Sequence, residues 1–289
     1  PSDFSTRRGA RINVLVNHDF GPTELAVNVG YRDRQARATQ VFFGATSLLD
    51  TAVRVSSFSP RLRMPYALSG ASGSLVVGLD HDDWSYDSVF NGGFFGSHAL
   101  ASQRNSALYA QNTLQFERTT LTVGVRGQRT GNTVTELLPA PAPLDQGRNL
   151  GAWEVALRHM PAPGLSVYGK AGTSFRVATV DENRFLVSLL EPQKSRDGEL
   201  GAEYRTGALH LRTALFRMDL TNEIYFSPLF PPFGANVNLS PTRREGLEAE
   251  TSWAPVADLR LFANLSVTSA KFRSGVYGGT DVSGKDVPL

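Results

Sequence analysis

The sequence predicts an all-β protein, an antiparallel up-and-down β-barrel that spans a membrane, and three observations support this. Apolar and polar residues alternate through segment after segment between residues 11 and 273, as expected for strands with two unlike faces. The polar face is charged along its length, where a small dry barrel would carry Val or Leu. The strands are also long, since residues 101–117 can extend on the order of 55 Å, beyond an apolar band about 25 Å tall.

The alternation is clearest in residues 165–176, where Leu165, Val167 and Phe175 share one face while Lys170 and Arg176 share the other. The same period of two recurs at residues 24–32, 121–128 and 259–268. A soluble sandwich would also alternate, so the pattern alone does not choose between the two classes. The charged face and the strand length favour the membrane barrel.

The connections are expected to be short on one side of the membrane and long on the outer side, which gives about twelve strands in up-and-down order. The short connections are placed at residues 21–22, 66–72, 118–119, 161–164, 206–207 and 254–258. The long connections are placed at residues 42–50, 88–100, 134–147, 177–193, 227–235 and from 274 onward. The run 209–224 fits least well, because its apolar face changes side near Ala214, which predicts a β-bulge.

Composition excludes several classes of protein. The chain has 289 residues, of which 41% are hydrophobic and 19% charged, with a formal net charge of +2. No run of 18 apolar residues is present, which excludes a transmembrane helix. The basic residues are scattered, so no nucleic-acid partner is expected. The absence of Cys excludes disulfides and thiolate metal sites.

The two ends predict that residues 1–289 form a transmembrane β-barrel domain that is an incomplete portion of a larger barrel. The first residues show no basic and apolar signal-peptide pattern, and the last residues fall in a loop directly after a strand. Barrels of this kind need an even strand count and paired edges. We therefore expect further strands outside this sequence.

Seven segments occur in an order that carries a family resemblance. They are residues 107–112 (ALYAQN), 121–126 (LTVGVR), 168–176 (YGKAGTSFR), 191–195 (EPQKS) with 199–201 (ELG), 216–224 (FRMDLTNEI), 244–248 (REGLE) and 284–288 (GKDVP). Together they resemble the barrel of a TonB-dependent outer-membrane receptor. The resemblance is close over about two thirds of the chain. The first hundred residues share only the general character of such barrels.

The resemblance implies a receptor in the outer membrane of a Gram-negative bacterium that takes up an iron–siderophore complex or cobalamin. Its partners would be a ferric siderophore or similar chelate, outer-membrane lipid, its own plug domain and the TonB complex. The sequence contains neither a plug nor the closing strands, so a barrel fragment is expected. Cobalamin or haem uptake within the same family, a passive pore and an outer-membrane enzyme are the alternatives. No enzyme activity, cofactor or metal is expected.

The ligand is expected to contact aromatic and cationic side chains in the long connections, because iron chelates are often anionic or catecholate. The candidates are Phe42, Phe43, Phe90, Phe94, Phe95, His98, Arg184, Phe185, Tyr225, Phe226, Phe230 and Phe233. Each of them can instead pack within its own loop. Phe94 and Phe95 are favoured, because glycines flank them and no core is evident that would bury their rings.

Ionisable residues offer no clear catalytic site. The densest cluster is residues 80–83 (DHDD), but on a strand Asp80 and Asp82 face one way while His81 and Asp83 face the other. That separation favours a solvated strand end over a metal or catalytic site. Arg176 and Glu199 are expected to form an ion pair inside the barrel or to touch the plug.

Overall fold

The computed structural model describes residues 3–42, 44–92, 96–138, 142–184, 186–229 and 234–287, and for residues 42 and 142 it describes the backbone only. The described chain is mostly β-strand, with one short 3-10 helix, η1 (Asp181–Asn183). No helix in these ranges is long and apolar enough to cross a membrane. The all-β class predicted from the sequence is confirmed.

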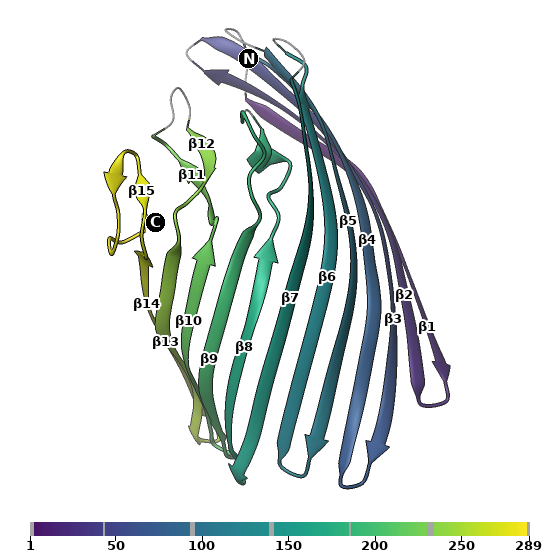
Figure 1. The fold of residues 1–289 in the computed structure, drawn as a ribbon, viewed down its shortest axis with the longest axis vertical. Coiled ribbons are helices and arrows are strands. Elements are labelled where there is room, and N and C mark those ends of the chain that lie inside the picture. The colour runs from purple at the N-terminus through teal and green to yellow at the C-terminus, as the bar shows by residue number, and fades with distance from the viewer. Residues whose placement is uncertain are drawn as a thin grey trace.

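Twelve strands form one antiparallel sheet, in which sequence neighbours pair throughout (Figure 1). They are β1 (Phe4–Phe20), β2 (Thr23–Phe42), β3 (Ala45–Leu68), β4 (Ala71–Asn91), β5 (Gly96–Phe116), β6 (Thr119–Glu136), β7 (Ala142–Ala162), β8 (Leu165–Arg176), β9 (Gln193–Arg205), β10 (Leu209–Thr221), β13 (Thr242–Val256) and β14 (Leu259–Phe272). Two small hairpins stand apart from this sheet, β11 (Ile224–Ser227) with β12 (Ala235–Asn238), and β15 (Val276–Tyr277) with β16 (Thr280–Asp281). The predicted up-and-down order of about twelve strands is confirmed.

The turns at one end of the sheet are short, as predicted. β1 and β2 are joined by Gly21 and Pro22 alone, and a similarly tight turn at Ser69 and Gly70 joins β3 to β4. Gly21 and Gly70 have φ angles of 62° and 76°, in the left-handed region that only glycine enters at little cost. The glycines therefore fix where each hairpin closes and, with it, the register of the paired strands.

At the opposite end, the long connections predicted at residues 42–50, 88–100 and 134–147 are wrong in extent. The strands continue, so β2 and β3 are separated by two residues, 43 and 44. The pairing continues because polar side chains replace the apolar ones without breaking the ladder, as in the ion pair between Arg37 and Asp50. The predicted long connections after β8, β10 and β14 are present and contain η1 and the two small hairpins.

β10 has no bulge, contrary to the prediction. It pairs without a register shift with both β9 and β13, whereas shifts occur in the β7–β8 and β13–β14 pairs. The apolar face changes side because Leu215 ends the outward apolar row and Arg217 follows it, while Leu220 on the other face is buried. The apolar residues thus change face because the surroundings of β10 change along its length, and this gives the same sequence pattern as a β-bulge.

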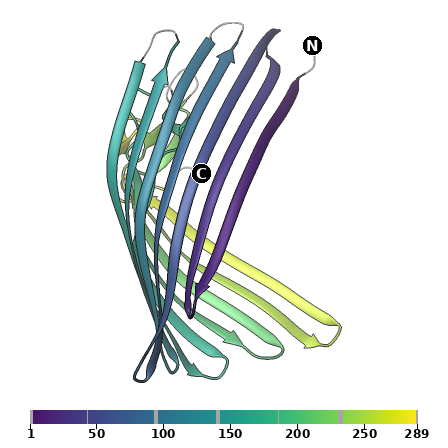
Figure 2. The same ribbon diagram turned by 90° about the vertical axis from the view of Figure 1, so that its right-hand side faces the viewer.

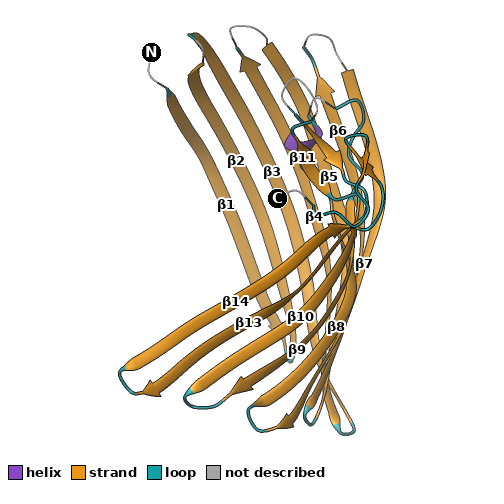
Figure 3. Ribbon diagram, turned by 90° about the vertical axis from the view of Figure 1, so that its left-hand side faces the viewer, coloured by secondary structure: helices purple, strands orange, loops and turns teal. Residues whose placement is uncertain are grey.

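The sheet bends into a trough (Figures 2 and 3). Strands β1 to β7 form one wall and β9 to β14 the other, and β1 and β14 do not pair with each other within the described residues. η1 and the β11–β12 hairpin lie inside the bend (Figure 3). Two small buried clusters form where these inner elements meet the upper walls, one around Leu189 and one around Leu239. The rest of the sheet is a single layer.

Candidate ligand-binding surface

The convex face of the sheet carries a continuous apolar band. The register aligns Leu200, Leu215, Leu247 and Val267 in one row across β9, β10, β13 and β14. Leu200 is 68% exposed, and Val125 on β6 is 54% exposed, so no second layer formed by the described residues covers this face. A band of exposed Leu and Val on a sheet whose inner strands are hydrogen-bonded on both sides suits contact with lipid hydrocarbon.

The concave face carries charges that pair across strands. Arg126 on β6 reaches over β5 to Asp80 on β4, with Nη1 at 2.6 Å from Oδ2. Lys170 on β8 lies 2.8 Å from Glu199 on β9. Because the partners are partly exposed, each pair contributes at most about 1 kcal/mol to stability. Their main effect is to fix the positions of the charged groups over the interior surface.

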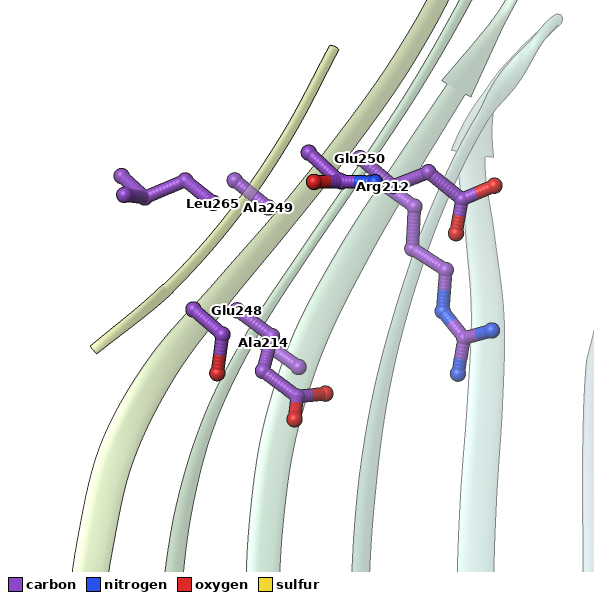
Figure 4. A pocket seen from close by; sticks show the side chains of 8 residues that line it. Arg212, Ala214, Glu248, Ala249, Glu250 and Leu265 are labelled. Carbon is purple, nitrogen blue, oxygen red and sulfur yellow. The ribbon is translucent and has the colours of Figure 1, made fainter. Parts of the chain in front are cut away.

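A groove near the β14 edge shows the division between the two faces (Figure 4). Arg212, Glu248 and Glu250 point to the concave side, while Ala249 and Leu265 point the other way. The groove has a volume of about 250 Å³ and is open to the trough. The alternation predicted from the sequence therefore holds at the level of single side chains.

The acidic cluster at residues 80–83 is split between the two faces, as predicted. The four side chains bond to different partners: Asp80 to Arg126, His81 to Ser106, Asp82 to Asn105 and Asp83 to Arg104. Among the residues that the structure describes, no group of three His, Asp or Glu side chains could hold a metal ion. The cluster thus supplies separate cross-strand contacts.

The connection after β8 folds inward over the concave face, and we call its described residues, 177–184 and 186–192, the inner segment. It is tied to the wall by Gln103, whose Nε2 donates to the Ala178 carbonyl at 3.1 Å, and by Tyr86, whose hydroxyl donates to Asp181 at 3.0 Å. Leu189 completes the tie by packing against the wall in a buried cluster. The inner segment therefore narrows the trough at its upper end.

Arg184, one of the predicted ligand contacts, is buried at the base of the inner segment. Its side chain is 9% exposed and lies 3.4 Å from Glu136. Its guanidinium also donates to Ser88 and Ser97 at 3.3 and 3.2 Å. These contacts indicate an anchor between the inner segment and the ends of β4, β5 and β6.

The predicted ion pair between Arg176 and Glu199 is wrong. Arg176 lies at the upper end of β8, opposite Gln193, and pairs with Glu182 of the inner segment at 2.9 Å. Glu199 lies lower, opposite Lys170, and pairs with that residue. The two residues belong to neighbouring strands but to different heights.

Four other predicted contact residues fall in described parts of the upper rim, and they do not form one cluster. Phe90 and His98 lie within β4 and β5, and His98 Nε2 is 2.9 Å from Asp87. Tyr225 packs on the buried cluster beneath β15, whereas Phe226 beside it is 55% exposed. Phe226 is the most exposed of these four, and its contact with a ligand stays a prediction.

The remaining candidates lie outside the described residues. They are Phe43, Phe94, Phe95, Phe185, Phe230 and Phe233, together with the side chain of Phe42. The favoured pair, Phe94 and Phe95, is among them, so its contact with a ligand stays a prediction.

A basic cluster on β1 and β2 was missed by the sequence analysis. Arg7, Arg11, Arg32 and Arg34 lie on the concave face, with Arg11 directly opposite Arg32. The Arg32 guanidinium lies 5.5 Å from the centre of the Trp84 ring, but none of the four has an ion-pair partner among the described residues. The turn at Gly21 and Pro22 fixes this register, so counting outward from the turn would have revealed the cluster.

Comparison with known families decides what kind of barrel this is. The model of the TonB dependent receptor-like β-barrel family matches residues 1–289. The chain belongs to the TonB-dependent receptor family. No curated protein sequence matches it.

Solved structures share the fold of this TonB-dependent receptor chain at low sequence identity. The unliganded ferric citrate transporter FecA has a TM-score of 0.81 at 16% identity, over 99% of this chain and 45% of FecA. The siderophore receptor PiuA of Acinetobacter baumannii has 0.80 at 12%, over 99% and 51%. The ferric yersiniabactin uptake receptor FyuA of Yersinia pestis has 0.77 at 14%, over 100% and 46%. The chain thus spans about half the length of these proteins, and its open sheet corresponds to part of a receptor barrel.

Proposed function

We propose that this chain belongs to an outer-membrane receptor that takes up an iron–siderophore complex with energy from the TonB system. Family membership supports TonB-dependent transport, and three similar structures are a ferric citrate transporter, a siderophore receptor and a ferric yersiniabactin uptake receptor. At 12 to 16% identity these likenesses support the fold, so the cargo is argued from this chain's own residues.

The observation that carries the proposal is the basic cluster of Arg7, Arg11, Arg32 and Arg34. Like charges directly opposite each other on paired strands destabilise the sheet, and Arg11 and Arg32 are so placed. An anionic occupant of the trough removes that repulsion. Guanidinium groups match the paired oxygens of carboxylate and catecholate donors, which an anionic ferric chelate presents.

The arrangement of the receptor follows from the two faces. We propose that the convex apolar band contacts outer-membrane lipid of a Gram-negative bacterium, and that the chain works as part of a larger barrel with a plug domain and the TonB complex. The described charged groups act in binding and packing, and we propose no catalytic role for them.

A passive pore is the second candidate, and the inner segment favours it. The inner segment folds into the trough, as a constriction loop would, and is anchored there through Arg184. A pore would conduct ions without an energised partner. A receptor would need the TonB complex for uptake.

The test uses the full-length receptor, measured for binding against ferric siderophores of carboxylate and catecholate type, haem and cobalamin. The proposal expects binding of an anionic ferric siderophore and loss of its uptake in cells without TonB. Binding of cobalamin or haem alone would assign another cargo in the same family. Steady ion conductance in planar bilayers, with uptake unaffected by TonB, would support the pore instead.

A further inference from the structure

A hollow interrupts the convex face where β7 to β10 run side by side. It has a volume of about 490 Å³ and is lined by Trp153, Ala171, Thr173 and Gly198, together with the charged residues Arg196, Asp197, Arg217 and Asp219. A Cβ added to Gly198 would meet no atom within 4 Å. The small residues therefore leave an open, elongated space beside the indole of Trp153, on the face that carries the apolar band.

A row of charged residues crosses the same face level with Trp153 and Thr173, and two of its members, Arg196 and Asp219, line the hollow. The register places Arg196, Asp219, Arg243 and Lys271 side by side on β9, β10, β13 and β14. Each lies four residues along its strand from the apolar row that contains Leu215, which is about 13 Å at a strand's rise. The charges thus lie just beyond the apolar band, at the level expected for lipid headgroups.

The balance of charge in this region is positive. Asp219 accepts from Arg243 at 2.6 Å and lies 3.5 Å from Arg217 and 3.7 Å from Arg273. Lys194 and Arg196 have no ion-pair partner in the part of the chain that the structure describes. Six cations lie among three carboxylates on this surface: Lys194, Arg196, Arg217, Arg243, Lys271 and Arg273 among Asp219, Glu245 and Asp286, the last of which forms an isolated β-bridge with Lys271.

Strands β2 to β5 of the opposite wall lack this excess. On β2 to β5 the convex charges above the band are paired one to one, Arg37 with Asp50 at 2.5 Å and Arg104 with Asp83 at 2.8 Å. Compared with β2 to β5, the strands β9 to β14 beside the hollow therefore carry a surplus of cations. A phosphate group would balance it.

We propose that the convex cluster and the hollow together bind one phosphate-bearing membrane lipid, with its phosphate among Lys194, Arg196 and Arg217 and an acyl chain along Trp153. The proposal rests on the outer-membrane location given under the proposed function. Arginine forks suit phosphate oxygens, and each cation near a membrane surface adds about 1 kcal/mol to anionic lipid binding. Trp at the edge of the apolar band suits the membrane interface.

The experiment measures lipid bound to the full-length receptor by native mass spectrometry, in phosphatidylcholine nanodiscs that contain increasing phosphatidic acid. Lys194→Gln with Arg196→Gln removes two unpaired convex cations. We expect each substitution to weaken phosphatidic acid binding about fivefold, and the two together to weaken it roughly 25-fold. The matched control is Arg61→Gln with Arg260→Gln, which removes the same charge from the concave face and should leave lipid binding unchanged.

A second variant separates a lipid from a free anion. Gly198→Leu fills the hollow without altering any charge, and we expect it to weaken phosphatidic acid binding about tenfold. Inorganic phosphate does not need the hollow. It should therefore compete poorly with phosphatidic acid, and to the same extent in the wild-type receptor and in Gly198→Leu.

Equal lipid binding by the convex and concave double variants would overturn the proposal. So would full lipid binding by Gly198→Leu, or displacement of the lipid by millimolar phosphate, because a free anion would then suffice. Membrane fractionation of the receptor is scored separately, so a failure of the proposed location is distinguishable from a failure of this site.

Discussion

Arg11 and Arg32 lie directly opposite each other on β1 and β2, with both side chains on the concave face. Neither has an ion-pair partner in the described residues, and the Arg32 guanidinium lies 5.5 Å from the centre of the Trp84 ring. Two facing cations cost about 0.2–1 kcal/mol. The pair is therefore suited to an anionic occupant, which would reverse the sign of that interaction.

Replacing Arg11 and Arg32 together by Gln should weaken binding of an anionic ferric siderophore at least tenfold, since hydrogen bonds from charged groups contribute about 1.5–3 kcal/mol each. The free energy of unfolding should stay constant or rise by about 0.2–1 kcal/mol, because the repulsion is gone. Calorimetric titration and urea unfolding measure the two effects. Arg61→Gln, on the same face but lower, serves as the control. A double variant that binds as tightly as wild type would remove these residues from the site.

Replacing Arg184 by Gln should release the inner segment from the wall. The change leaves Glu136, 16% exposed in its side chain, without its cation, and breaking such a buried pair costs about 3–5 kcal/mol. Hydrogen exchange should rise across residues 177–192. Arg176→Gln is the matched control, because its pair with Glu182 is more exposed and worth at most about 1 kcal/mol. Equal exchange in the two variants would contradict the anchoring role of Arg184.

The attachment of the inner segment should weaken in acid through Glu191. A hydrogen bond from Arg148 lowers the pKa of Glu191 below its ordinary value, and this group lies in the connection before β9. A lowered folded-state pKa means that the stabilisation is complete above the ordinary carboxyl pKa and is lost as the pH falls through the lowered value. Hydrogen exchange near residue 191 should therefore increase only on acidification below that ordinary value. The pH dependence should shrink in Arg148→Gln, and an unchanged profile would exclude this pair as its source.

Leu265 and Asn264 are neighbours on β14 that face opposite sides, so they give a direct comparison of lipid and interior. Leu265→Arg places a charge on the apolar band and should destabilise the inserted barrel by about 2–4 kcal/mol if it lies near the bilayer midplane. Asn264→Arg should have little effect, because Glu250 lies opposite on β13. Unfolding from lipid vesicles measures both. Similar losses would argue against the division of faces.

The strand number, the tight turns and the two faces were predictable from the sequence, because each depends on local chemistry. Period-two alternation sets the faces, and the turns close at residues such as Gly21 that tolerate positive φ. The family resemblance, based on seven short segments, is confirmed by the match over residues 1–289. The charge of the concave face was predicted from the same alternation.

Contacts between distant segments could not be predicted in this way. Arg184 meets Ser88 and Ser97, about ninety positions away in the chain, only because the inner segment folds over the wall. The strands were expected to end where the apolar residues end, whereas pairs such as Arg37 with Asp50 extend the ladder. The arginine cluster depends on the register between β1 and β2. To find it from the sequence, one must first place the turn and then work out which residues of the two strands share a face.

The central claim, that lipid covers the convex face and water fills the concave side, is tested most directly by spin-label accessibility. The chain contains no Cys, so single cysteines can be introduced at each residue from 121 to 126 in the full-length receptor without replacing any in this region. We predict that labels at 121, 123 and 125 are reached by oxygen dissolved in the bilayer, while those at 122, 124 and 126 are reached by a water-soluble nickel complex. Equal accessibility at odd and even positions, or the opposite alternation, would contradict the account.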